Sequence, residues 1–570
     1  MPLGRSKRTK QQSMIDKGDK KTVPVLVDGI EYQLTAGANL MEEILHLGRD
    51  DHRYPDQRDH GDHYIPHYCY HPGLTVAGNC RMCFVNITTE VKRGDDVQKV
   101  TTPTTACTQV VREGLEVDTK SEQVRDTQNN IQEFLLINHP LDCPECDKSG
   151  ECRLQDYAFD FGRDYSRFDE TKTAAHIKQL GPNIDFFGTR CIQCSRCIRV
   201  ADEVSGTSEL CFVNRGDRTT IDTFPTIPID NELDLNVVQV CPVGALKNHD
   251  FLYQSRVWSM GEDESVCNLC SKGCTIRYDS LKSVVKRVMA GENREVNDFW
   301  ACNEGRLNFE WINRSDRLLQ PRDKSGNELS WTDSYVKITE RLRSHMDKSP
   351  EAIGVVVNAS QTLEELYLMR QLFKDLLGVS EFAAITREDG EAKTFKNFEI
   401  EADKNPNRKG VELVFGIDNC ESSLKKMIEN LNAGKIKTLV VVNNSWDAYV
   451  SSELKTAMSK AEFVVGMGLF EDDFCNKCDI TLATQTHAEK DGSYINSKWH
   501  LQAFRKAVGD VAGLPDAEIL QEFIDRIDKP DEESPMLSVA GVFKVASESI
   551  PQLSGYSHRD LIRSGGATLM

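Results

Sequence analysis

The spacing of the cysteines constrains this chain more than any other feature of its sequence. The chain contains 19 cysteines, and most of them lie between Cys69 and Cys302 in groups whose spacing suits iron rather than disulfides. If Cys211 is left out, this stretch offers four sets of four ligands, namely Cys69, Cys80, Cys83 and Cys107; His139, Cys143, Cys146 and Cys152; Cys191, Cys194, Cys197 and Cys241; and Cys267, Cys270, Cys274 and Cys302. The spacing therefore predicts four iron-sulfur clusters on one chain.

The second set contains the single histidine ligand. A helical pattern over Asp126 to Asn138, with Ile131, Phe134 and Leu135 on one face, must end near His139-Pro140. Three cysteines follow within thirteen residues and lack a fourth, so ligand count favours His139 over a structural histidine. A neutral imidazole in place of a thiolate makes a cluster less negative and easier to reduce.

The third set is similar to half of a bacterial two-cluster ferredoxin, whose usual run is C-x2-C-x2-C-x3-C-P. Ala201 occupies the fourth position of that run, so the distant Cys241-Pro242 must close the site. Cys211 lies between apolar neighbours and is expected to be a buried thiol.

Net charge and hydropathy limit the kinds of partner that the chain can have and where in the cell we expect it. The formal net charge of -20 argues against nucleic acid and favours protein partners. No run approaches the roughly 18 apolar residues of a membrane span, and residues 1–21 have no apolar core, so we expect a soluble protein that stays inside the cell. Residues 1–21 are basic and are expected to form a disordered arm, and the histidine-rich stretch 51–71 is expected to be a solvated loop.

Two folds are predicted at the ends of the cysteine-rich stretch. Strands at 23–27 and 30–34 around an Asp28-Gly29 turn, then a helix at 38–47, indicate a small ferredoxin-type fold. Beyond Cys302, strands at 352–357, 438–442 and 463–467 alternate with helices at 364–377 and 451–460, which predicts a parallel sheet covered on both faces. No dinucleotide or P-loop motif is found, and Cys475 and Cys478 form an isolated pair.

Zinc is the competing interpretation, since C-x2-C pairs also bind zinc. Three features count against it: the His-x3-Cys-x2-Cys-x5-Cys order, the C-x2-C-x2-C run completed by Cys-Pro, and the absence of paired C-x2-C halves. Redox centres without a nucleophile or a nucleotide motif describe an electron relay.

Several long stretches in one order carry a family resemblance: residues 69–72, 78–83, 134–143, 190–199, 206–216 and 241–246. Over about residues 23–507 the chain resembles the 75-kDa-type iron-sulfur subunit of respiratory complex I, the bacterial NADH-quinone oxidoreductase. The resemblance implies a [2Fe-2S] cluster on the first set and [4Fe-4S] clusters on the second and third. It implies a further [4Fe-4S] cluster, found in only some bacterial members and off the main path, on the fourth set.

The resemblance also implies an electron path and partners. Electrons from NADH would come from an NADH/FMN-binding subunit, enter the first set, cross the third and second sets, and leave to a two-cluster ferredoxin-like subunit. A quinone-site subunit completes the peripheral assembly, on the cytoplasmic side of the bacterial inner membrane. No catalytic residue is expected on this chain.

The implied fold class is multidomain α/β: a ferredoxin-like (β-grasp) [2Fe-2S] domain, α+β iron-sulfur domains, and a degenerate molybdopterin-oxidoreductase-like domain expected to hold no pterin. Glu304 stands where such enzymes carry a lysine, and Ser497-Lys498-Trp499 replaces the end of their pattern after residues 489–496. The expected domains are 1–21, 22–120, 121–165, 166–258, 259–320, 321–525 and a tail, 526–570. The rival hypothesis is a subunit of an NAD-linked formate dehydrogenase or hydrogenase, which shares the same front end.

Overall fold

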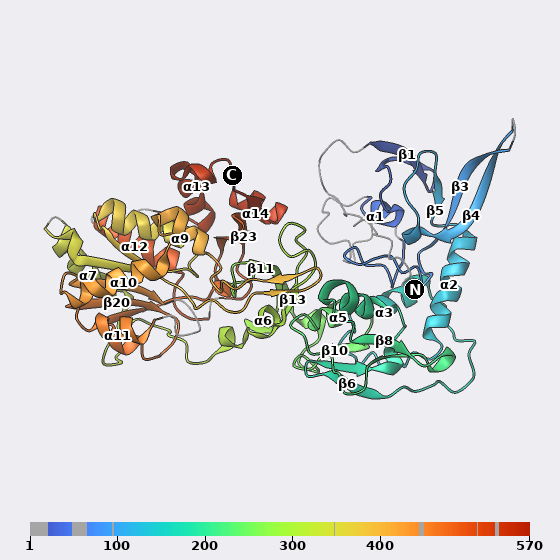
Figure 1. The fold of residues 1–570 in the computed structure, drawn as a ribbon, viewed down its shortest axis with the longest axis horizontal. Helices are drawn as coiled ribbons and strands as arrows, with labels where there is room; N and C mark the ends of the chain where they lie inside the picture. The colour runs from blue at the N-terminus through green and yellow to red at the C-terminus, as the bar shows by residue number, and fades with distance from the viewer. Residues whose placement is uncertain are drawn as a thin grey trace, which may run out of the picture. The chain divides into compact units, whose positions relative to one another are not determined.

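The computed structural model describes residues 21–47, 65–93, 96–346, 348–443, 450–509, 511–529 and 535–569. The chain divides into two units, Met1–Val257 and Trp258–Met570 (Figure 1). The predicted basic arm, except Lys21, and most of the histidine-rich stretch lie outside the described residues.

A mixed sheet in the order β2-β1-β5-β3-β4 opens the first unit. The predicted hairpin is confirmed: β1 (Thr22–Val27) and β2 (Ile30–Thr35) pair around a turn at Asp28 and Gly29, both with positive φ. The remaining strands are β3 (Phe84–Arg93), β4 (Asp96–Thr105) and β5 (Glu116–Asp118), the last parallel to β1. The helix α1 (Leu40–Leu45) is shorter than predicted, because Asn39 caps it by accepting hydrogen bonds from two backbone N–H groups.

The rest of this unit combines short helices with small sheets. Its elements are α2 (Glu122–Leu136), α3 (Arg153–Phe161), α4 (Arg196–Val200), α5 (Leu235–Gln239), a sheet of β6 (Ile177–Gly181), β7 (Ile184–Phe187) and β10 (Leu246–Asn248), and a hairpin of β8 (Leu210–Val213) and β9 (Thr220–Thr223).

The face that α2 buries differs from the predicted one. Phe134 is 74% exposed, whereas Val124, Gln128 and Gln132 are buried. Gln132 accepts a hydrogen bond from the Tyr68 hydroxyl at 2.5 Å, and its amide donates to the Leu154 carbonyl at 3.2 Å. Apolar periodicity fails here because hydrogen bonding satisfies the buried glutamines.

A small antiparallel sheet begins the second unit. It contains β11 (Gly261–Val266), β12 (Thr275–Leu281) and β13 (Val284–Ala290), and the short helix α6 (Asn303–Leu307) follows. The second unit also contains the short pair β17 (Lys393–Thr394) and β18 (Glu399–Ile400), and a sheet of β22 (Gly492–Ile495), β23 (His500–Phe504) and β24 (Ala567–Thr568).

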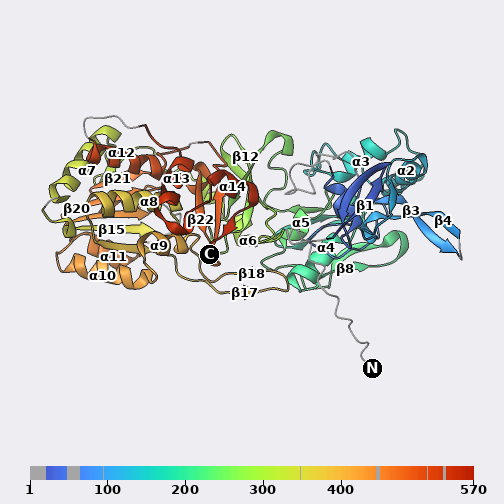
Figure 2. The same cartoon turned by 90° about the horizontal axis from the view of Figure 1, so that it is seen from above.

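The main sheet of the second unit has the order β14-β21-β20-β19-β15-β16 and is parallel except for the edge strand β14. Its strands are β14 (Arg322–Asp323), β15 (Ile353–Asn358), β16 (Glu381–Ile385), β19 (Thr438–Asn443), β20 (Phe463–Gly468) and β21 (Ile480–Ala483). Helices cover both faces (Figure 2): α7 (Trp331–Met346), α8 (Leu363–Met369), α9 (Arg408–Phe415), α10 (Cys420–Asn432), α11 (Ser452–Met458) and α12 (Asp516–Asp528). The parallel α/β sheet was correctly predicted.

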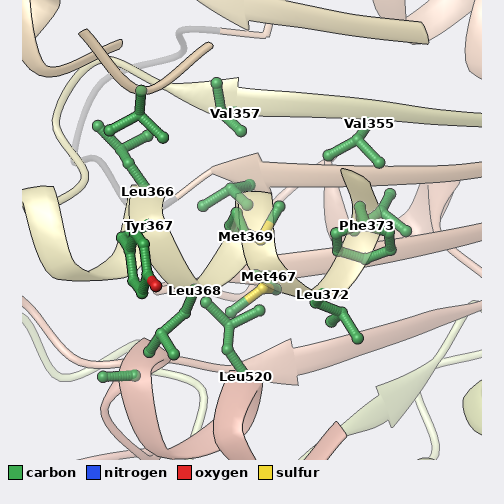
Figure 3. Close-up of a cluster of buried hydrophobic side chains, with 14 of the residues drawn as sticks. Val355, Val357, Leu366, Tyr367, Leu368, Met369, Leu372, Phe373, Met467 and Leu520 are labelled. Atoms are coloured by element: carbon green, nitrogen blue, oxygen red, sulfur yellow. The ribbon is translucent and has the colours of Figure 1, made fainter. Parts of the chain in front are cut away.

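Alternate residues of the strands feed two cores. Val355 and Val357 point to the core shared with α7, α8 and α12, whereas Val356 points to the core shared with α10 and α11. Figure 3 shows Leu366, Met369 and the following turn filling the first of these cores beneath β15. This alternation follows from the pleat of the strand.

The expected tail 526–570 is folded where the structure describes it. It contains α13 (Val539–Ser549) and α14 (His558–Ser564), and β24 pairs with β23. Val542, Phe543 and Leu561 are buried in the first core. The serine and glycine content suggested a tail, but apolar residues at helical spacing outweigh it.

Leu366→Ala should lower the free energy of unfolding of the second unit by about 2–5 kcal/mol, because a fully buried leucine leaves a cavity. Urea denaturation followed by circular dichroism measures the loss. Leu319→Ala, at a side chain that is 59% exposed, is the matched control. Equal stability of the two variants would contradict this packing.

Candidate metal centres

The structure brings the first set together beside the N-terminal sheet. Cys69, Cys83 and Cys107 are buried and Cys80 is partly exposed. The Cys69 N–H donates to the Cys80 sulfur at 3.5 Å. The thiol of Cys107 lies within hydrogen-bonding reach of Cys69 and Cys83. Hydrogen bonds from Cys107 and then Cys80 lower the pKa of Cys69, while the same contact with Cys69 raises the pKa of Cys107. The sulfurs of Cys69, Cys83 and Cys107 therefore lie close together.

Local structure fixes this set. Asn39, which caps α1 through its oxygen, also donates through Nδ2 to the Cys107 carbonyl at 2.8 Å. Gly78 and Arg81 have positive φ, so the loop curls around Cys80 and points backbone N–H groups inward. The N–H groups of Cys80 and Asn79 lower the pKa of Cys69. Such donors favour a thiolate.

The second set lies between α2 and α3. His139 follows the end of α2, and its N–H donates to the Leu136 carbonyl at 3.2 Å. Burial lowers the pKa of His139 to about 4, so its imidazole is neutral at pH 7 and able to ligate iron. The Cys143 thiol faces Cys146, and Asp142 and Arg190 face both His139 and Cys143. Cys152 is the N-cap residue of α3, and burial raises the pKa of its thiol to about 11 while the backbone of Gln155 and Leu154 acts in the opposite direction.

The backbone at Gly244 lies so close to a ligand sulfur of the second set that only glycine fits there. A Cβ on Gly244 would lie 2.2 Å from the Cys146 sulfur, too close for any side chain. Because Gly244 follows Cys241 by three residues, the segment that closes the third set also encloses the second.

The third set lines one cavity with all four of its cysteines. Arg196 and six apolar side chains complete the wall, the latter being Phe186, Ile192, Ile221, Val243, Ala245 and Leu246. Gln193 and Ser195, between the cysteines, have positive φ, and the Gln193 N–H donates to the Cys191 sulfur at 3.4 Å. Burial raises the pKa of Cys194 to about 11. A bound metal cation would displace that proton.

The fourth set lies in the second unit, beside β11 and α6. The Cys267 N–H donates to the Cys274 carbonyl at 2.8 Å, and Cys302 caps α6. A Cβ on Gly305 would stand 3.3 Å from the Cys267 sulfur and 3.9 Å from the Cys302 sulfur. Burial raises the pKa of Cys270 to about 12, while the Lys404 ammonium acts in the opposite direction. Lys404 also pairs with Glu304 at 2.6 Å.

All four sets thus fit iron-sulfur clusters in donor chemistry. Each gathers thiols in a mostly buried pocket with inward N–H groups or a close-approaching glycine, and each has one cysteine that is partly exposed: Cys80, Cys143, Cys191 or Cys302. Among the described residues, no group of three or more His, Cys, Asp or Glu side chains is arranged to hold a single metal ion.

Buried basic residues beside these sets escaped the sequence analysis. Arg190 pairs with Asp142 at 2.6 Å, and Arg196 and Arg199 reach from the third set toward the first. The sequence contained a signal, since Arg190 and Arg196 each immediately precede a cysteine and Arg199 lies two residues after Cys197.

Three sequence expectations concern residues outside the sites. Cys211 is exposed, not buried as predicted, because it lies in the solvent-facing hairpin of β8 and β9. In the described part of the histidine-rich stretch, His67 and His71 are buried, not solvated as predicted. His67 contacts Arg153 at 2.6 Å, and His71 accepts from the Gly73 N–H at 3.1 Å. Cys475 and Cys478 are buried and donate to carbonyls of their own turn.

The polar residues of the pterin-like stretch 489–496 are engaged within the chain. Glu489 pairs with Arg317 at 2.8 Å, and Lys490 pairs with Glu365 at 2.5 Å and with Asp516 at 2.6 Å. The Asn496 amide donates to the carbonyl of Lys272 in the fourth-set loop at 3.1 Å. The stretch therefore holds its own domain and the fourth set together.

Comparison with protein families gives four matches. They are a 2Fe-2S iron-sulfur cluster binding domain over residues 20–122, the NADH-ubiquinone oxidoreductase-G iron-sulfur binding region over residues 128–167, the ferredoxin-like domain of NADH-quinone oxidoreductase subunit 3 over residues 181–247, and molybdopterin oxidoreductase over residues 379–524. The predicted fold class is confirmed.

Curated relatives agree with these matches. The G subunit of the NADH-quinone oxidoreductase of Rickettsia prowazekii is 31% identical over 62% of this chain and 49% of its own length. The mitochondrial NADH dehydrogenase [ubiquinone] iron-sulfur protein 1 of Solanum tuberosum is 34% identical over 62% of this chain and 44% of its own length. The chain thus spans about half the length of the curated relatives it matches. A solved chain of an NAD+-reducing [NiFe]-hydrogenase has 26% identity and a TM-score of 0.34, covering 41% of this chain and 91% of that one.

The resemblance to the 75-kDa-type subunit of complex I is therefore confirmed as homology. Within the described residues, no helix has the length and apolar character needed to cross a bilayer.

Gly244→Ala should remove or distort the cluster of the second set, because the new Cβ would collide with the Cys146 sulfur. We expect a loss of up to about four iron per chain, measured by iron analysis and EPR. Gly261→Ala is the control, since its Cβ would meet nothing closer than 3.8 Å. Unchanged iron and spectra in Gly244→Ala would contradict the assignment of this site.

Proposed function

We propose that this homologue of the 75-kDa-type subunit relays electrons through iron-sulfur clusters in the peripheral arm of a proton-pumping NADH-quinone oxidoreductase. The observation that carries the proposal is that the three sets of the first unit are joined in series by the chain's own contacts. The order along these contacts is first, third, second.

The first and third sets meet through two arginines of α4. Arg196 donates to the carbonyl of Tyr70, next to Cys69, and to the carbonyl of Val240, next to Cys241, the latter at 3.2 Å. Arg199 donates to the carbonyl of Cys69 itself. Two ligand loops are thereby bound to one helix.

One segment of the chain and one ion pair join the third set to the second. Residues 241–244 run from the Cys241 ligand to the backbone against Cys146. The N–H of Arg153, the residue after Cys152, donates to the Pro242 carbonyl at 3.2 Å. Arg190, next to Cys191, pairs with Asp142, next to Cys143. Close spacing of this kind suits electron transfer between neighbouring sites.

An iron-sulfur cluster, when bound, accepts and releases one electron at a time. The residues around it hold the ligand sulfurs, exclude water and supply N–H donors that favour negative charge. At the second set the neutral His139 lowers the negative charge of the site, which favours electron arrival there. The proposed assignments are [2Fe-2S] for the first set and [4Fe-4S] for the others.

The fourth set is proposed to lie off this path. It belongs to the second unit, and its loop is bound to that unit by the Ser271 N–H, which donates to the Asp403 carbonyl at 2.8 Å, and by the contact with Asn496. We propose that the surrounding domain is a scaffold without pterin.

The proposed partners are the NADH/FMN-binding subunit, the two-cluster ferredoxin-like subunit and the quinone-site subunit of complex I. In this arrangement the chain contributes no substrate site, and it lies peripherally on the cytoplasmic side of the bacterial inner membrane. We also propose the domain boundaries predicted from the sequence as far as residue 320. Beyond it, one domain includes α12, α13, α14 and β24 in place of a separate tail.

Anaerobic iron, sulfide, zinc and molybdenum analysis of the purified chain, with EPR after dithionite reduction, tests the relay. About fourteen iron per chain and no molybdenum is the expected result. His139→Ala should lose or alter one [4Fe-4S] signal, whereas His176→Ala, at an exposed histidine, should not. Zinc in place of iron would refute the relay, and stoichiometric molybdenum would favour the formate dehydrogenase class.

Cys302→Ser should remove the fourth cluster while NADH-to-quinone turnover of the assembled complex stays near that of the wild type. Cys194→Ser is the matched variant and should abolish turnover, because the third set lies within the proposed path. Collapse of turnover in an assembled Cys302→Ser complex would place the fourth set on the path.

A further inference from the structure

Two arginines of α4 are buried without reaching solvent. Arg196 is 2% exposed and Arg199 is 8% exposed. Burying a guanidinium is costly unless negative or polar groups surround it. The groups around Arg196 and Arg199 therefore indicate the role of these two cations.

The Arg196 guanidinium acts as a fork between two ligand loops. It donates to carbonyls next to Cys69 of the first set and next to Cys241 of the third. Arg199 extends the clamp by donating to the carbonyls of Cys69 and Thr75, and through Nε to the Ser195 hydroxyl at 3.3 Å. A planar guanidinium holds two carbonyls in a fixed geometry, because its N–H donors form a rigid fork.

The groups near Arg196 that can carry negative charge come from both sets. They are the sulfurs of Cys194 from the third set and of Cys69 and Cys80 from the first, together with the Tyr157 hydroxyl. Glu203 additionally faces Arg199, and Arg153 is a neighbouring cation. The same positive charge thus lies within electrostatic reach of two ligand sets.

We propose that Arg196 is a shared positioning residue, which fixes the separation of the first and third sites and raises the reduction potential of both. This inference rests on the proposed iron-sulfur occupancy of these sites.

The physical reason is the sign and position of the charge. Reduction adds one negative charge to a site, and a buried cation stabilises that added charge more strongly than a solvated one would. When one electron leaves the first site and reduces the third, it stays beside the same guanidinium. Arg196 should therefore raise both potentials while changing their difference little.

The test uses the purified full-length chain with its clusters, followed by EPR during a redox titration. Signals are first assigned by their loss in Cys80→Ser and Cys194→Ser. In Arg196→Gln, with iron content retained, the midpoint potentials of the first and third sites should both fall, and those of the second and fourth should not. Arg196→Lys, which keeps the charge, should restore both potentials toward the wild-type values.

Arg287→Gln is the matched control, because Arg287 is similarly buried but pairs with Asp279 in the second unit. The inference is overturned if Arg196→Gln keeps its iron and both potentials, if all four potentials shift alike, or if Arg196→Lys lowers them as much as Arg196→Gln does. If Arg196→Gln loses iron, Arg199→Gln decides: it should lower the potential of the first site, and an unchanged potential overturns the inference. A wild-type chain without iron would instead refute the proposed function.

Discussion

Burial of negative sulfur is the constraint on which the rest of this structure depends. The free-energy cost of removing a thiolate from water must be offset by hydrogen bonds or by positive charge. Without them, burial keeps thiols protonated, as the raised pKa values of Cys191 and Cys194 show. The ligand loops supply N–H donors through residues with positive φ, such as Arg81, Gln193 and Ser195. Turns that would be unusual in an ordinary loop are here the means of accommodating charge.

The same constraint explains why the first three sets share segments. Each donor and each compensating cation is costly to bury, so contacts that serve two sites reduce the number required. The backbone around Gly244 lies against the second set only three residues after Cys241 closes the third. The pairing of Arg190 with Asp142 joins the same two sets by charge. Because the sites share these buried contacts, they follow one another closely, as an electron relay requires.

The sequence predicted the parts of the structure that depend on spacing and failed where side chains from distant segments decide. The β1 and β2 hairpin and the parallel sheet follow from local pattern, and the structure brings the cysteines of each set together. The buried face of α2 was wrong because Gln132 is satisfied by Tyr68 and Leu154, which no periodicity reveals. The prediction that Cys211 is buried was wrong, because apolar neighbours do not fix which side of a hairpin faces water. Arg196 was overlooked because its partners lie on both sides of it in the chain, more than forty residues away.

In the second unit, side chains and backbone groups from distant parts of the chain support the buried sulfurs of the fourth set. Its fourth set is supported by Lys404, which lies about a hundred residues along the chain and pairs with Glu304. Its ligand loop is bound through Ser271 to Asp403, after β18, and through Lys272 to Asn496, after β22. Lys490, buried between Glu365 and Asp516, fixes the stretch that makes the second of these contacts. Lys404 and Lys490 are thus engaged in ion pairs within the chain, which is consistent with the proposed scaffold role.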